Sequence, residues 1–175
     1  MIRTLILALF CLPAWADWTA HFDARMGIIT MQTELVGKGR QTLIGDSNTE
    51  AFWWSAVGGC NIINAGMGGS TIGEIAKRVD AIAAVTMPKI AHVMVGTNDS
   101  GITAQTRADM TRIIVVLRNY GAMVVVWPIP SNPTGNAAAI NALWAEVSAQ
   151  NGAYWDWWWP TLVSVNPDGI HLTPE

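Results

Sequence analysis

Short apolar runs alternate with amphipathic segments along most of the chain. Four of the runs are followed directly by a glycine or a proline, and the fifth ends in an aspartate. Short apolar runs with such boundaries are typical of buried strands in a parallel sheet. The sequence therefore predicts five strands, at residues 42–44, 61–65, 90–95, 123–127 and 153–156.

Helical periodicity lies between these runs. Three segments carry apolar residues at positions i, i+3, i+4 and i+7, which places them on one face of a helix. Gly121 and Pro88 follow two of these segments and are expected to stop the helices. Two further helices are expected at 18–36 and 48–57. The periodic positions are Ile72, Ile75, Ala76 and Val79; Met110, Ile113, Ile114 and Leu117; and Ile140, Leu143, Trp144 and Val147.

Alternating strands and helices predict an α/β fold with three α/β/α layers and a mostly parallel five-stranded sheet. In such folds ligands bind outside the carboxyl ends of the strands. The segments in which to look for a site are therefore 46–48, 66–71, 96–100 and 128–133.

Composition indicates a folded single domain and argues against a disordered or nucleic-acid-binding protein. The chain has 175 residues, which suits one domain, and 51% of them are hydrophobic against 13% charged. That is ample material for a core and argues against disorder. The net charge is −3 and the basic residues form no run, so we expect no nucleic-acid partner. Ten tryptophans against three phenylalanines and two tyrosines are the one anomaly.

The first sixteen residues match the three-part pattern of a secretory signal peptide. Arg3 is followed by the apolar stretch 5–12, which is too short to span a bilayer, and then by Ala14-Trp15-Ala16. We therefore expect residues 1–16 to be cleaved, leaving a single secreted or periplasmic domain at 17–175 with no stable membrane insertion. The alternative is a buried N-terminal strand or helix.

Cysteine content points to no disulfide framework. Cys11 lies within the expected signal peptide, which leaves Cys60 without a partner. We expect Cys60 to be a small buried residue and not a nucleophile.

The expected strand ends and the C-terminal segment hold the groups that nucleophilic acyl transfer needs. These are a hydroxyl, a base, an acid that orients the base, and donors for the oxyanion. Ser47 offers a hydroxyl at a strand-to-helix turn, and His171 offers a base with Asp168 three residues before it. Gly66 offers a backbone N–H that no side chain shields, and Asn98 offers a side-chain amide.

These residues lie in four blocks that resemble the SGNH (GDSL-type) hydrolase family, in the right order and over the whole chain after residue 16. Gly45-Asp46-Ser47 resembles the nucleophile block, and Gly66 stands where the family has its oxyanion glycine. The third block is Gly96-x-Asn98-Asp99, and the fourth is Asp168-x-x-His171.

The resemblance implies the flavodoxin-like fold of that family and a serine esterase without a cofactor. It makes Ser47 the nucleophile, His171 the general base and acid, and Asp168 the orienting acid. The oxyanion hole would consist of the Ser47 and Gly66 N–H groups and the Asn98 amide. The chain stops four residues after His171, where family members continue into a terminal helix, so we expect a fragment or a domain without that helix.

Other motifs are absent from the sequence. No Gly-x-Ser-x-Gly pentapeptide occurs, and the glycines around Gly66 fail the dinucleotide pattern because Thr71 replaces the third glycine. There is no P-loop, His-Glu-x-x-His or Cys-x-x-Cys, so we expect no metal and no cofactor. A flavodoxin-like nucleotide or flavin binder stays open as an alternative.

Substrate contacts are the least determined feature. The resemblance, the expected secretion and the tryptophans favour small O-acyl esters, above all acetyl esters on carbohydrates. The alternatives are a lipid or thioester acyl hydrolase and a catalytically weak carbohydrate-binding relative. The tryptophans either form a sugar platform or pack in the core.

His21 and His92 are expected to be structural, and the sequence indicates no oligomeric state. Position suggests five substrate contacts: Asp46, Asn48, Asp99, Ser131 and Asn132.

Overall fold

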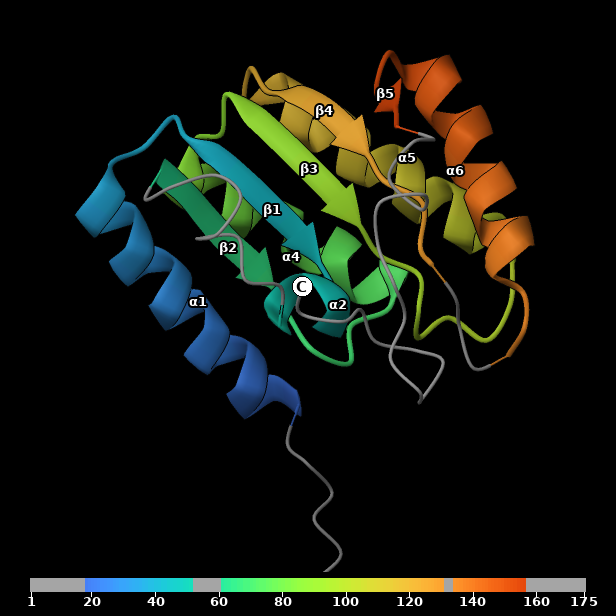
Figure 1. Ribbon diagram of the computed structural model, residues 1–175, viewed down its shortest axis with the longest axis horizontal. Coiled ribbons are helices and arrows are strands. Elements are labelled where there is room, and N and C mark those ends of the chain that lie inside the picture. The colour runs from blue at the N-terminus through green and yellow to red at the C-terminus, as the bar shows by residue number, and fades with distance from the viewer. Residues whose placement is uncertain (1–17, 52–60, 131–133, 157–175) are drawn as a thin grey trace, which may run out of the picture.

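A computed structural model describes residues 18–51, 61–130 and 134–156 of the chain. It has five parallel strands in the order β2-β1-β3-β4-β5, which confirms the predicted fold class (Figure 1). The strands are β1 (Gln41–Gly45), β2 (Ile62–Gly66), β3 (Ile90–Met94), β4 (Met123–Val126) and β5 (Tyr154–Trp155). The helices are α1 (Trp18–Val36), α2 (Ser47–Ala51), α4 (Ile72–Thr86), α5 (Ala104–Asn119) and α6 (Ala137–Asn151).

Strand order fixes where a ligand can bind. The chain passes from β1 to β2 on one side and then returns to β3 on the other, so β1 lies between them. Loops that leave the carboxyl ends of β1 and β3 therefore diverge, and the crevice between them is the usual ligand site of an open α/β sheet.

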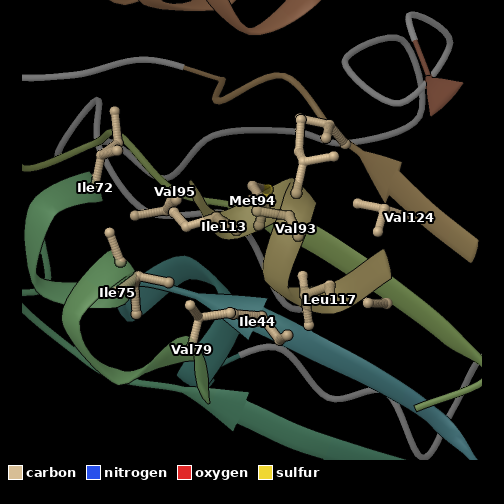
Figure 2. Packing of buried hydrophobic residues seen from close by; sticks show 14 of the residues in the cluster. Ile44, Ile72, Ile75, Val79, Val93, Met94, Val95, Ile113, Leu117 and Val124 are labelled. Atoms are coloured by element: carbon tan, nitrogen blue, oxygen red, sulfur yellow. The ribbon is translucent and has the colours of Figure 1, made fainter. Parts of the chain in front are cut away.

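One face of the sheet is covered by α4 and α5. All twelve apolar positions of the predicted helical pattern are buried, as the periodicity requires. Ile44 and Val93 of the sheet lie close to Val79 of α4 and Leu117 of α5 (Figure 2). Thr71 caps the start of α4 by accepting the Glu74 N–H, and the reciprocal pair Thr103 and Thr106 caps α5. Those caps fix where both helices begin.

The opposite face carries α2 at the carboxyl ends of the strands. Side chains alternate between the faces of a strand, so Gly66 points away from the face that Ala65 shares with Ile44. A Cβ built on Gly66 would lie 2.2 Å from the Glu50 backbone N of α2. Helix α2 begins at Ser47, one residue earlier than the predicted helix 48–57. The part of that predicted helix beyond Ala51 lies outside the described residues.

The first helix protects the edge strand of the sheet. The Gln32 side chain of α1 accepts the Asn64 N–H at 3.0 Å, and Arg25 donates to the Asn64 and Gly66 carbonyls. These are outward-facing groups of β2, which would otherwise be an open template for another strand. Phe22 of α1 also packs beneath the Arg78 guanidinium of α4 at 3.8 Å. Side chains of α1 therefore reach the carboxyl end of β2.

Three tryptophans of the described chain serve in packing. Trp144 is fully buried and donates its indole N–H to the Val95 carbonyl at 2.9 Å. Trp127 is buried against the His92 ring, with centroids 4.7 Å apart, and Trp155 packs on the core. Trp127 and Trp155 were also candidates for a sugar platform; the other candidates, at 53, 54 and 157–159, lie outside the described residues. Within the described ranges no helix is long and apolar enough to cross a membrane.

Candidate active site

The predicted nucleophile lies where β1 gives way to α2. Ser47 is the first residue of α2 and its side chain is partly exposed. A Cβ built on Gly68 would lie 3.8 Å from the Ser47 Cβ, so the hydroxyl-bearing side chain faces the loop between β2 and α4. This placement at a strand-to-helix turn is the one that the sequence predicts.

Asp46 holds two of the site's loops together. Its carboxylate accepts the Asn48 N–H at 3.0 Å, as a helix cap does, and the Thr97 N–H of the β3–α5 loop at 3.1 Å. Burial raises the pKa of Asp46, and the hydrogen bonds from Thr97 and Asn48 oppose that rise. The side chain of Asn48 in turn donates to the Thr97 hydroxyl at 3.2 Å.

Burial corrects two predicted substrate contacts. Asp46 is 0% exposed and Asn48 is 2% exposed, so a substrate at the surface of this structure reaches neither side chain. Both residues act on the site indirectly, because they fix the β3–α5 loop against the start of α2. The sequence does not reveal this, since Thr97 is 51 residues away from Asp46.

The structure also contradicts Gly66 as an oxyanion donor. Its N–H donates to the Asn64 side-chain oxygen at 2.9 Å, and that amide group also donates to the Thr49 carbonyl at 2.9 Å. The missing side chain at Gly66 serves packing instead, because the backbone of α2 occupies the space where a Cβ would lie.

The segment after Gly66 contains one backbone N–H that is not already bonded within the described part of the chain. The Met67 N–H donates to the Gly45 carbonyl, the Gly68 N–H to Glu50 Oε2 and the Ser70 N–H to the Met67 carbonyl. Gly69 is the one residue between 66 and 70 whose N–H donates to no group in the described part of the chain. It is exposed and has φ +75°, which favours glycine. The adjacent Gly68-Gly69 pair is a turn signal that could have pointed to it.

Asn98 lies on the loop after β3, beside this turn. Its exposed side-chain amide donates to the Ser70 carbonyl at 3.0 Å, which ties the β3–α5 loop to the β2–α4 loop. One hydrogen of that nitrogen is used in this bond and a second remains. The loops that carry Ser47, Gly69 and Asn98 are thus interlocked at one edge of the sheet.

Asp99 has both a structural contact and a perturbed carboxyl. Its Oδ2 accepts the Ile72 N–H at the start of α4, at 3.0 Å. Burial is the largest cause that raises the pKa of Asp99 to about 6, and the nearby Asp46 and Asp109 carboxylates add to it. Asp99 is partly exposed, so the predicted substrate contact stays a prediction.

Four predicted residues lie outside the described residues: Asp168 and His171 of the triad, and Ser131 and Asn132. His21, which the sequence analysis expects to be structural, lies near the site. His21 Nε2 would be 3.7 Å from a Cβ on Gly68 and is 3.2 Å from Glu50 Oε2. No sequence signal shows this, because it depends on how α1 runs along β2.

Replacing Gly66 with alanine is expected to destabilise the fold by about 3 kcal/mol or more. The new methyl group would meet Glu50 N at 2.2 Å and Glu50 Cα at 2.6 Å, and backbone atoms cannot move aside as a flexible side chain can. Urea unfolding measures the loss. Gly101→Ala is the matched control, because nothing lies within 4 Å of its Cβ position. Equal stabilities of the two variants would contradict this packing role.

Asp99→Asn is expected to remove a pH-dependent loss of stability. A carboxyl whose pKa rises from 3.8 to about 6 on folding favours the folded state when protonated. Wild type therefore loses stability from this group as pH rises from about 4 to 6, by about 1–2 kcal/mol after solvent screening. The asparagine oxygen can still accept the Ile72 N–H. Urea unfolding at pH 4 and pH 7 measures the free energy of unfolding of both proteins, and that of the variant should rise relative to wild type at pH 7. If the difference between the two proteins is the same at both pH values, the raised pKa of Asp99 is contradicted.

Several solved structures share the fold of this chain. They include an SGNH-hydrolase family esterase and a GDSL-like lipase, and the chain has the fold of the SGNH hydrolases. No family model matches the chain, and no curated protein matches it in sequence.

Three of these structures show the extent of the likeness. AlinE4, an SGNH-hydrolase family esterase, is 21% identical over 79% of this chain and 88% of its own, with a TM-score of 0.61. A GDSL-like lipase from Bacteroides thetaiotaomicron is 15% identical over 90% and 89%, with a TM-score of 0.64. The esterase EstA from Pseudoalteromonas sp., in a structure inhibited by monoethylphosphonate, is 18% identical over 76% and 87%, with a TM-score of 0.60.

Proposed function

We propose that this protein is a serine ester hydrolase whose nucleophile is Ser47. The observation that carries the proposal is the interlocking of three loops at one sheet edge. The Asp46 carboxylate ties the start of α2 to Thr97, and the Asn98 amide ties Thr97's loop to the Ser70 carbonyl. Ser47, the Gly69 N–H and the Asn98 amide belong to these three loops, and a hydroxyl with backbone and side-chain N–H donors is the set that acyl transfer needs.

In the proposed reaction Ser47 Oγ attacks the ester carbonyl carbon while His171 takes the hydroxyl proton. Asp168 orients the imidazole and stabilises its positive charge. The carbonyl oxygen becomes an oxyanion, which receives hydrogen bonds from the Ser47 N–H, the Gly69 N–H and the second hydrogen of the Asn98 amide. Gly69 replaces the sequence-based choice of Gly66.

The tetrahedral species then breaks its bond to the alcohol oxygen. That oxygen takes the proton from His171 and leaves as the alcohol, and the acyl group stays on Ser47. Water attacks the acyl-enzyme while His171 takes a proton from that water. The second tetrahedral species then breaks its bond to Ser47 Oγ, which takes the proton back from His171, and the carboxylic acid is released. No step requires a metal or a redox cofactor.

Small O-acyl esters are the proposed substrates, with acetyl esters on carbohydrates first. Support for this choice comes from the resemblance to SGNH hydrolases, from the expected secretion and from the ten tryptophans. Secretion by way of a signal peptide at 1–16 is part of the proposal.

The test is hydrolysis of p-nitrophenyl acetate, butyrate and octanoate by the full chain. We expect turnover, with acetate giving the highest kcat/KM. A preference for octanoate would favour a lipid or thioester acyl hydrolase of the same mechanism. A chain that is folded by circular dichroism and hydrolyses none of the three would contradict the enzyme and favour a binding protein.

A further inference from the structure

Three polar side chains from two helices meet next to the nucleophile. His21 and Arg25 lie one turn apart on α1, and Glu50 lies on α2 three residues after Ser47. Glu50 Oε2 is 3.2 Å from His21 Nε2, and Glu50 Oε1 is 3.5 Å from Arg25 Nε. The Arg25 side chain is only 11% exposed and that of Glu50 is 25% exposed. We call these three residues the α1–α2 cluster.

Glu50 connects this cluster to the turn that carries Gly69. Its Oε2 accepts the Gly68 N–H, a hydrogen bond strengthened by the negative charge on the acceptor. The peptide bond after Gly68 supplies the Gly69 N–H, so the bond to Glu50 restricts how that N–H is directed. A shift of 1 Å in such a donor is enough to slow a reaction strongly.

Arg25 anchors the carboxylate from the other side. Its guanidinium donates to the Gly66 carbonyl at 2.8 Å and to the Asn64 carbonyl at 3.2 Å, at the end of β2. An exposed ion pair would add little to stability. This one is mostly buried and shares its members with two backbone segments, which suits it to fixing a geometry.

We propose that Glu50 is a positioning residue, whose carboxylate, held by Arg25 and His21 of α1, fixes the Gly68–Gly69 turn so that the Gly69 N–H meets the substrate's oxyanion. The inference rests on the proposed function and adds α1, which carries none of the four sequence blocks, to the working parts of the site. Loss of Glu50 then weakens stabilisation of the transition state more than substrate binding, so it lowers kcat and leaves KM nearly unchanged.

The first test compares Glu50→Ala, Glu50→Gln and the control Glu34→Gln in the full chain. Glu34 is an exposed carboxylate elsewhere on α1. For p-nitrophenyl acetate we expect Glu50→Ala to lower kcat about 10- to 100-fold with KM within about twofold. Glu50→Gln keeps an oxygen that can accept the Gly68 N–H and should recover most of kcat. If wild type is active and the kcat of Glu50→Ala is within about twofold of the wild-type kcat, the inference is overturned.

A second test measures whether Glu50 holds the Gly68–Gly69 turn, and it does not depend on enzymatic activity. Amide hydrogen exchange by NMR should show a protected Gly68 N–H in wild type, and Glu50→Ala should lose that protection while the amides of α5 keep theirs. This separates the two proposals: a wild type without esterase activity contradicts the proposed function, and the exchange of Gly68 still decides whether Glu50 holds the turn. Unchanged protection at Gly68 would overturn the inference.

A third variant covers the case in which Glu50→Ala does not fold. Gly68→Ala keeps Glu50, but its methyl group would lie 3.0 Å from Glu50 Oε2 and 3.7 Å from His21 Nε2. Gly68 is outside the left-handed region, so alanine suits its backbone. We expect kcat to fall about 10-fold or more with KM nearly unchanged, whereas Gly101→Ala should match wild type. A Gly68→Ala variant with wild-type kcat would count against the positioning role.

Discussion

Ser47→Ala is expected to lower the hydrolysis of p-nitrophenyl acetate by about 10⁴-fold or more. Without the hydroxyl no acyl-enzyme forms, and the remaining donors can only assist the slow attack of water. The side chain is partly exposed and lies at the first residue of α2, so the variant should fold as wild type does. The measurement is kcat/KM for both proteins, with thermal unfolding recorded alongside.

Ser100→Ala is the matched control for this loss. Ser100 is an exposed serine of the β3–α5 loop, close in sequence to Asn98, and no catalytic role is proposed for it. Its variant should keep wild-type kcat/KM. An Ser47→Ala protein that is folded and retains more than about a tenth of wild-type activity would exclude Ser47 as the nucleophile.

Asn98→Ala is expected to lower kcat by about 10²–10³-fold, the usual cost of removing one oxyanion donor. KM should change little, because the amide is proposed to bind the charge that develops after the substrate is bound. Asn98→Asp should lose at least as much, since it replaces a donor with a negative charge. Steady-state kinetics on p-nitrophenyl acetate give both constants.

Asn98 also donates to the Ser70 carbonyl, so part of any loss could come from a displaced loop. Thermal unfolding checks for a general loss of stability, and the Gly68 exchange measurement checks the loop itself. An Asn98→Ala protein with kcat within about fivefold of wild type would remove this residue from the proposed oxyanion hole.

The fold could be predicted from the sequence because its determinants are local. Strand-sized apolar runs and helix-sized periodic segments alternate, and the buried positions of α4, α5 and α6 are those that the period of 3.6 selects. Because the predicted strand ends lie close to the observed ones, the sequence also places Ser47 and Asn98 on loops at the carboxyl edge of the sheet.

The parts of the site that could not be predicted depend on distant partners. Gly66 ends β2 and Gly69 lies in the loop that follows it. Only the position of the Asn64 side chain shows that the Gly66 N–H is already bonded. The role of Asp46 in joining two loops depends on its hydrogen bond with Thr97, and the position of His21 depends on the packing of α1 along β2. Spacing along a chain does not report such contacts.

The most direct test of the account is covalent trapping of Ser47 by a fluorophosphonate. Only a serine activated by a base reacts readily with such a phosphorus centre. The account predicts one adduct per folded chain, located by mass spectrometry on Ser47 and missing from the Ser47→Ala variant. A folded protein that forms no adduct, or that carries the adduct on another residue, would contradict the central claim that Ser47 is the nucleophile.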